Sequence, residues 1–67
     1  MKLGDTVRDS VTSFEGVAVA KIEWFKGTTA YVVQAKTLNN EGKIVQHEFE
    51  EGRLEVVSAK AARGKAA

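Results

Sequence analysis

Residues 14–25 read FEGVAVAKIEWF, and this stretch gives the clearest indication of the fold. Every even-numbered position in it is apolar or glycine, whereas the odd-numbered positions mix valine and phenylalanine with charged residues. Alternation with a period of two is the signature of a β-strand that buries one face. The small residues at positions 16, 18 and 20 favour a tightly curved sheet, and Gly16 is a candidate bend or bulge. The stretch therefore predicts one long strand whose even-numbered residues face the core.

Further strands are predicted on both sides of this stretch. Residues 4–9 read as a turn that leads into a short strand, and strands are also predicted over 29–38, 43–50 and 55–57. Turns are expected at 26–28, where Gly27 can adopt a positive φ, at 39–42 and, as a single 3₁₀ turn, at 51–54.

Five short strands joined by tight turns, with a 3₁₀ turn before the last, predict an all-β domain of the five-stranded SH3-like barrel class over residues 1–57. A small open sheet is the alternative. No long helix is available to cover a sheet, which favours closure of the barrel. Residues 58–67 have no apolar stripe and form a basic tail that we expect to be disordered unless a partner orders it.

The chain has 67 residues, no cysteine and one histidine. It is therefore one domain at most, and disulfides, thiolate metal sites and multi-histidine zinc sites are excluded within one chain. A domain of this size has a thin core and usually needs an additional source of stability. Because disulfides and these metal sites are excluded, association of several copies of the chain remains as the source of stability, and we expect a homo-oligomer. No metal and no cofactor are expected.

The net charge of +1 conceals an asymmetry along the chain. The tail carries Lys60, Arg63 and Lys65 and no acidic residue, whereas residues 1–57 have a balance of −2. A barrel that grips DNA through phosphates usually has a basic body, so this balance counts against nucleic acid as the main ligand of the barrel. The basic tail is expected to help in contacts with a protein or nucleic-acid partner. The N-terminus lacks a signal-peptide pattern and no apolar run is long enough to span a membrane, which predicts a cytoplasmic protein without membrane contact.

Few residues have the chemistry of a catalyst. His47 is the only side chain with an ordinary pKa near neutrality, and its strand neighbours Val45 and Phe49 are apolar, so it is expected to be structural or to contact a ligand. The serines fall in loops and in the tail, and no phosphate-binding glycine loop is present. The acidic cluster at positions 48, 50 and 51 reads as a solvated edge. We therefore expect a binding protein and not an enzyme.

The candidate binding residues are aromatic and basic. Trp24 and Tyr31 flank the first hairpin and are candidates for stacking on a ligand, with core packing as the alternative for both. Arg8, Lys21 and Arg53 are candidates for contacts with an anion, although lysines on strands commonly serve only to protect sheet edges.

The run Leu3-Gly4-Asp5-Thr6-Val7-Arg8-Asp9, followed by Phe14-Glu15-Gly16-Val17-Ala18, resembles a family of short proteins from phages, prophages and other mobile elements. In that family Gly-Asp-x-Val-Arg-Asp is followed by a glycine, an aromatic hairpin and Leu-Glu-Val-Val. The match covers residues 3–57. The resemblance implies an origin in a phage or mobile element, but no particular activity.

A more distant likeness is to the plasmid-encoded type II dihydrofolate reductases, which are SH3-like barrels assembled as tetramers around a pore. It rests on Gly4-Asp5-x-Val7-Arg8, Gly16, Trp24 and Leu54-Glu55. Those enzymes bind their ligands with a Val-Gln-Ile-Tyr segment, and the corresponding residues here are Val45-Gln46-His47-Glu48. The likeness implies that Gln46 contacts a ligand at a pore between subunits.

Three functional hypotheses follow. The first is a homo-oligomer that binds a small, nucleotide-like anion at subunit interfaces, for example to sequester a signal of host defence. Its expected ligand contacts are Trp24, Tyr31, Arg8, Lys21, Gln46, His47 and Arg53. The second is an adaptor barrel that binds a protein or nucleic acid, with help from the basic tail. The third is a reductase of the pore type.

Overall fold

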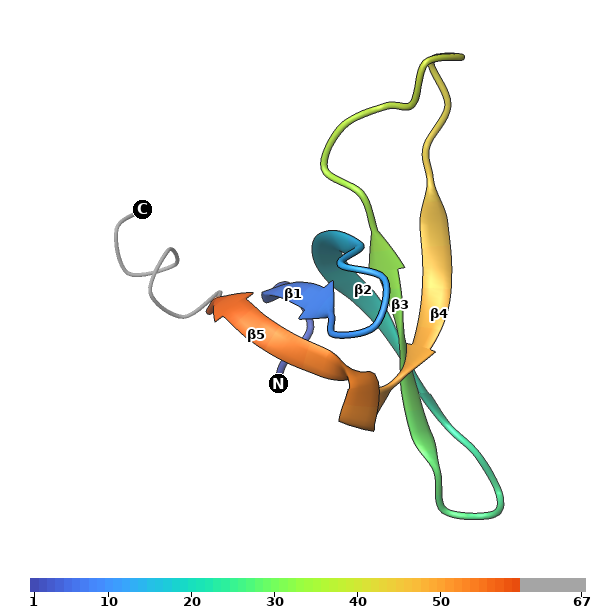
Figure 1. Ribbon diagram of the computed structural model, residues 1–67. Helices are drawn as coiled ribbons and strands as arrows, with labels where there is room; N and C mark the ends of the chain where they lie inside the picture. Colours follow the sequence, from blue (N-terminus) through green and yellow to red (C-terminus); the bar gives the residue numbers. More distant parts are fainter. Residues whose placement is uncertain (60–67) are drawn as a thin grey trace.

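The computed structural model describes residues 1–59, which form one antiparallel sheet of five strands in the order β4-β3-β2-β1-β5 (Figure 1). The elements are β1 (Thr6–Asp9), β2 (Glu15–Glu23), β3 (Thr29–Gln34), β4 (Gln46–Glu50), the 3₁₀ helix η1 (Glu51–Arg53) and β5 (Leu54–Ser58). The predictions of an all-β chain and of a 3₁₀ turn before the last strand are confirmed. The long strand β2 is the central strand of the sheet.

The strands at the two edges of the sheet, β4 and β5, are adjacent in sequence through η1. In Figure 1, β1 and β5 lie across the direction of β3 and β4, so the sheet is strongly twisted. Within residues 1–59 no strand pairing joins β4 to β5, and the sheet is not closed. Closure into a barrel therefore stays a prediction.

The core lies on one face of the twisted sheet. Its members come from all five strands: Val7, Ala18, Tyr31, Val33, Phe49 and Leu54. Met1 and Phe14 pack against this cluster from the side. Full burial of a large apolar side chain stabilises a fold by roughly 1.5–3 kcal/mol, so a core this small leaves little margin. Phe49 is buried in the core, and Tyr31 is only 2% exposed. The expectation that Tyr31 presents its ring to a ligand is therefore wrong.

A β-bulge in the middle of β2 changes which residues face the core. Ala18 lies opposite Val33, but Ala20 lies opposite Val32, so two steps along β2 match one step along β3. Cross-strand partners share a face, and the extra residue therefore reverses the alternation from Ala20 onward. The prediction that Ala20 and Ile22 share the face of Ala18 is wrong for this reason. The bulge lies beyond Gly16, the position at which the sequence suggested one.

The turns follow the local chemistry of the sequence. Gly27 has φ +98° in the β2–β3 hairpin, and Gly42 has φ +77° in the β3–β4 loop. Asn39 holds that loop, because its Oδ1 accepts hydrogen bonds from the backbone N–H groups of Glu41 at 2.8 Å and Lys43 at 3.0 Å. The strands around the loop are shorter than predicted, since β3 ends at residue 34 and β4 begins at residue 46.

The last strand, β5, extends to Ser58, one residue past the predicted end of the domain. Residues 60–67 lie outside the described part of the chain, and with them the three basic residues of the tail. Among residues 1–59, no helix has the length and apolar character that crossing a membrane requires.

Candidate functional site

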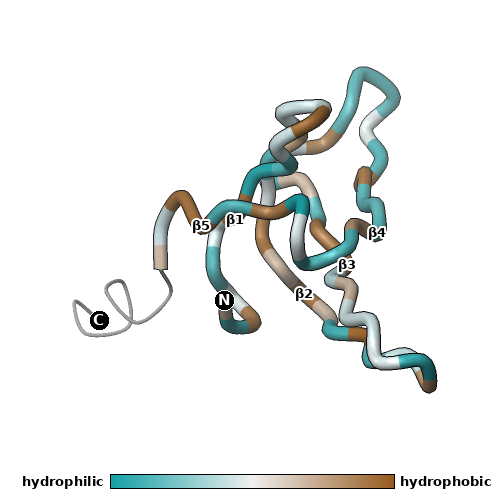
Figure 2. Tube along the Cα trace, turned by 60° about the horizontal axis from the view of Figure 1, so that its bottom comes forward, coloured by the Kyte–Doolittle hydropathy of each residue, from teal (hydrophilic) through white to brown (hydrophobic). Residues whose placement is uncertain are grey.

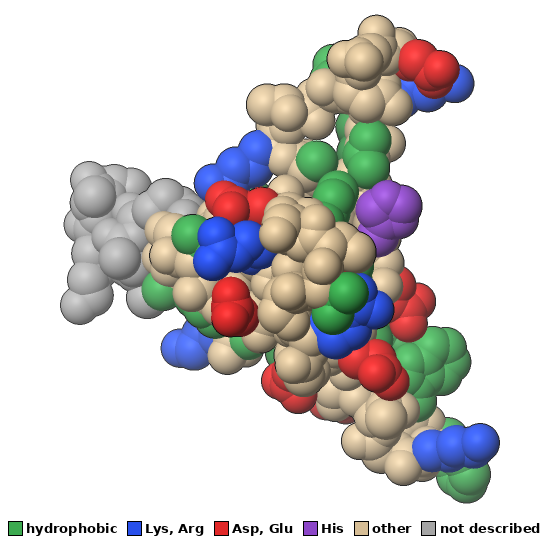
Figure 3. All heavy atoms as spheres, in the orientation of Figure 1, with side chains coloured by type: hydrophobic (Ala, Val, Ile, Leu, Met, Phe, Trp, Pro, Cys, Tyr) green, Lys and Arg blue, Asp and Glu red, His purple; other side chains and the backbone are tan. Residues whose placement is uncertain are grey.

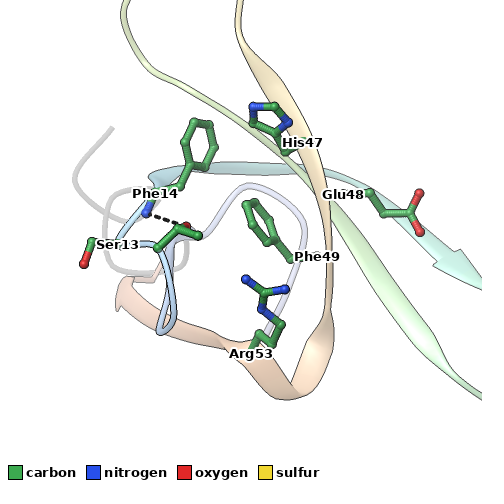
Figure 4. Close-up of a pocket in the computed structure, with 7 residues that line it drawn as sticks. Ser13, Phe14, His47, Glu48, Phe49 and Arg53 are labelled. Carbon is green, nitrogen blue, oxygen red and sulfur yellow. Dashed lines mark hydrogen bonds between the residues drawn. The ribbon is translucent and has the colours of Figure 1, made fainter.

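An open groove with a volume of about 470 Å³ lies between the β1–β2 loop, β4 and η1 (Figure 4). Its lining residues are Thr12, Ser13, Phe14, His47, Glu48, Phe49 and Arg53. We call it the aromatic groove, because three of these side chains carry rings. Loop residues supply one wall, and the core-facing side of an edge strand supplies the other.

The rings of the aromatic groove contact one another. Phe14 meets His47 edge to face, with ring centroids 5.2 Å apart and an interplanar angle of 81°. The ring centroids of Phe14 and Phe49 are 5.6 Å apart, and the guanidinium carbon of Arg53 lies 5.5 Å from the centroid of the Phe49 ring. Edge-to-face rings and a guanidinium over a ring face are favourable geometries. Figure 4 shows these four side chains gathered together, whereas Glu48 points away from them.

A short loop holds Phe14 in place. The backbone N–H and the hydroxyl group of Thr12 both donate to Oδ2 of Asp9, at 2.7 Å and 2.6 Å. Ser13 adopts a left-handed conformation with φ 67°, and its N–H donates to the carbonyl oxygen of Asp9 at 2.8 Å. The N–H of Asp9 in turn donates to the carbonyl oxygen of Phe14 at 2.8 Å. The carboxylate and backbone of Asp9 therefore organise the loop that carries Phe14.

The same carboxylate forms a two-point ion pair with Arg53. Nε of Arg53 donates to Oδ1 of Asp9 and Nη2 donates to Oδ2, both at 2.8 Å. Asp9 is fully buried, whereas the Arg53 side chain is 41% exposed. The hydrogen bonds from Arg53 hold the pKa of Asp9 well below its usual range and raise the pKa of Arg53. This pair fastens the end of β1 to η1, beneath the aromatic groove.

Stability is expected to fall as the pH drops below about 4, the pKa of an aspartate in an unfolded chain. Because the folded-state pKa of Asp9 is lower than that value, its contribution to stability is complete above pH 4 and is lost progressively toward lower pH. Urea unfolding at pH 7, 4, 3 and 2 measures this loss. Asp9→Asn is expected to flatten the acid dependence, and Glu55→Gln, at an exposed carboxylate, serves as the control. Equal acid dependence in Asp9→Asn and the unmodified chain would contradict the assignment.

Of the seven residues predicted to bind a ligand, only His47 and Arg53 line the aromatic groove. Trp24 is 53% exposed and lies in the β2–β3 turn, away from the groove-lining residues. Tyr31 is in the core, and the exposed Gln46 lies at the start of β4, opposite Gln34.

The two other predicted cations are each paired with a neighbouring acid. Nη2 of Arg8 lies 3.5 Å from Oε1 of Glu55, and Nζ of Lys21 lies 3.2 Å from Oε2 of Glu23. The hydrogen bond to Glu23 raises the pKa of Lys21. The fold therefore does not gather the predicted cations around one point in a single chain.

Sequence analysis missed Asp9 and Phe14, which organise and line the groove. Asp9 reads as a loop former, and its partner Arg53 is 44 positions away in sequence. Phe14 fits the apolar alternation of the following strand and reads as core. No local pattern marks either residue as part of a site, because the groove forms only when η1 folds back beside the β1–β2 loop.

The aromatic groove offers ring faces, ring edges and a partly exposed guanidinium. His47 contacts the rings of Phe14 and Phe49. No group of three or more histidine, cysteine or acidic side chains in this part of the chain is arranged to hold a metal ion. The groove therefore offers stacking and apolar contact, together with the exposed part of the Arg53 guanidinium. Comparison of the chain with protein-family models, with curated proteins and with solved structures found no match.

Proposed function

We propose that this protein is a non-catalytic binding domain whose aromatic groove receives an apolar or aromatic side chain of a partner protein. The observation that supports this most strongly is the open cluster of Phe14, His47 and Phe49 in a groove of about 470 Å³. Protein interfaces are centred on aromatic and arginine side chains that accept an anchor residue from the partner. The groove supplies both kinds of residue.

The proposal includes the architecture and the origin of the chain. The strand order β4-β3-β2-β1-β5 and the 3₁₀ turn before β5 support an SH3-like barrel in which β4 and β5 approach each other. The sequence resemblance over residues 3–57 supports an origin in a phage or another mobile element. Neither feature by itself specifies a ligand.

A small nucleotide-like anion is the second candidate ligand. An arginine side chain has five N–H donors, and Asp9 engages only Nε and Nη2 of Arg53, so further donors remain at the edge of the groove. A base stacked on Phe14 or His47 would bring its phosphate toward them. We rank this candidate second, because Asp9 already neutralises the charge of Arg53 and Arg8 and Lys21 are paired with acids of their own.

The proposed function is tested by selecting peptides from a random phage-displayed library against the unmodified chain. We expect the selected peptides to share an aromatic or large apolar anchor, and His47→Ala to weaken their binding by at least about tenfold, as loss of a central contact does. His47 is exposed, so the variant should fold, and its unfolding midpoint is measured alongside. Leu38→Ala removes an exposed apolar side chain outside the groove and should leave peptide affinity unchanged.

ATP and NADPH are titrated in parallel, with amide chemical shifts as the readout. Peptide binding that His47→Ala leaves intact would contradict the proposed function. Saturable shifts around Phe14 and Arg53 with ATP, and none with peptides, would instead support the anion-binding candidate. Saturable NADPH binding centred on Gln46 would support the reductase hypothesis.

A further inference from the structure

The turn that joins β2 to β3 displays two aromatic rings away from the body of the protein. Trp24 is 53% exposed, and Phe25 is fully exposed at 104% of its reference area. With Lys26 they form what we call the hairpin tip. Figure 2 shows the hydrophobic segment at the far end of this hairpin, and Figure 3 shows hydrophobic side chains beside a basic one at the same place. Exposed aromatic side chains gathered in this way are typical of an interaction site.

The backbone of the hairpin tip is well defined. The N–H of Trp24 donates to the carbonyl oxygen of Thr28 at 2.9 Å, and the N–H of Gly27 donates to the carbonyl oxygen of Trp24 at 2.8 Å. Gly27 takes the positive φ that closes the turn. The two rings are therefore presented on a closed turn, which reduces the entropy that is lost when they are buried on a partner.

The hairpin tip and the aromatic groove complement each other. The tip carries two apolar rings and the positive charge of Lys26, and it shares no lining residue with the groove. The groove carries apolar rings, and Glu48 lies at its edge with its carboxylate turned away from them. The positive charge of Arg53 is neutralised by Asp9 and does not oppose the approach of Lys26. A lipid surface or a nucleic acid would meet Lys26 but would leave the groove unused.

We propose that the hairpin tip of one copy docks in the aromatic groove of a second copy. This inference rests on the proposed function, because it names the partner that fills the same groove. The contact is head to tail, so repeated copies close into a ring or extend as a filament. It also places Trp24 of one copy beside His47 and Arg53 of the next, three candidate residues that a single chain keeps apart. Burial of the two rings covers about 150–250 Å² each, which supplies apolar area that the thin core of one copy lacks.

Sedimentation velocity over a concentration series tests the proposal with two single variants and their mixture. The unmodified chain is expected to self-associate, and Phe25→Ser and His47→Ala are each expected to lower the apparent association constant at least tenfold. Both positions are exposed, and thermal unfolding confirms that each variant is folded. Leu38 is an apolar residue in the β3–β4 loop and is 60% exposed. Leu38→Ser is therefore the matched control and should associate like the unmodified chain.

An equimolar mixture of the two variants tests whether the contact joins a tip to a groove. Phe25→Ser retains a groove and His47→Ala retains a tip, so an equimolar mixture should form 1:1 heterodimers and nothing larger. An unmodified chain that stays monomeric at the highest concentration overturns the proposal. So does self-association that only Phe25→Ser abolishes, because it indicates contact between two tips. In either case aromatic peptides that bind in a His47-dependent manner would leave the proposed function standing, so the two failures can be distinguished.

Discussion

Gly16→Ala is expected to destabilise the sheet by about 3 kcal/mol or more, the upper range for forcing an extra methyl group into a packed site. A Cβ atom at Gly16 would overlap the backbone carbonyl oxygen of Gln34 and crowd the Cα atom of Ala35. Backbone atoms of the central part of a sheet cannot move aside as a flexible side chain can. Gly16 also pairs with Val7 of the core, so a shift there would disturb β1 as well as β3.

Urea unfolding followed by tryptophan fluorescence measures the loss, since the chain has one tryptophan. The matched control is Gly52→Ala, because a Cβ atom at Gly52 would meet nothing within 4 Å and its φ is not in the left-handed region. That substitution should be neutral, or stabilising by about 0.4–1 kcal/mol through the unfolded state. Equal stability of the two variants would refute the close approach of β3 to Gly16.

Removal of the Arg53 side chain is the second large expected effect. Arg53→Ala would leave the fully buried carboxylate of Asp9 with Thr12 as its remaining side-chain hydrogen-bond donor. A buried charge that loses its partner is strongly destabilising, so we expect the equilibrium constant for folding to fall on the order of tenfold or more. The pKa of Asp9 should also rise toward its ordinary value, because the Arg53 hydrogen bonds are the main cause of its depression.

The control for this prediction is Arg8→Ala. Arg8 forms an exposed ion pair with Glu55 at 3.5 Å, and exposed pairs contribute little, so stability should change within experimental error. Asp9→Asn introduced into the Arg53→Ala chain should recover part of the lost stability, since it removes the buried charge. Thermal unfolding of the unmodified chain, of Arg8→Ala, of Arg53→Ala and of the double variant measures these differences in stability. Similar losses from Arg8→Ala and Arg53→Ala, or no recovery in the double variant, would show that the buried pair has no special role.

Much of the fold could be predicted because it depends on local chemistry. The alternation in residues 14–25 identified the central strand, and Gly27 and Asn39 identified the two hairpin turns, since positive φ and side-chain-to-backbone bonds are properties of single residues. The 3₁₀ turn followed from the same kind of signal. His47 and Arg53 were also identified as candidate site residues from the sequence, and both line the groove.

The other features of the fold and of the groove could not be predicted, because they depend on which strands meet and in what register. The bulge after Ala18 reversed the alternation of β2, since an extra residue in one strand is visible only against its partner strand. Tyr31 is buried because it lies opposite Phe49 in the sheet, a pairing that its own neighbours in sequence do not reveal. Asp9 and Arg53 meet across 44 positions, and their ion pair brings η1 beside the loop of Phe14. Local sequence patterns therefore indicate the strands, the turns and the kinds of residue available for binding. Packing decided which of those residues share a surface, because that choice depends on contacts between segments that are distant in the chain.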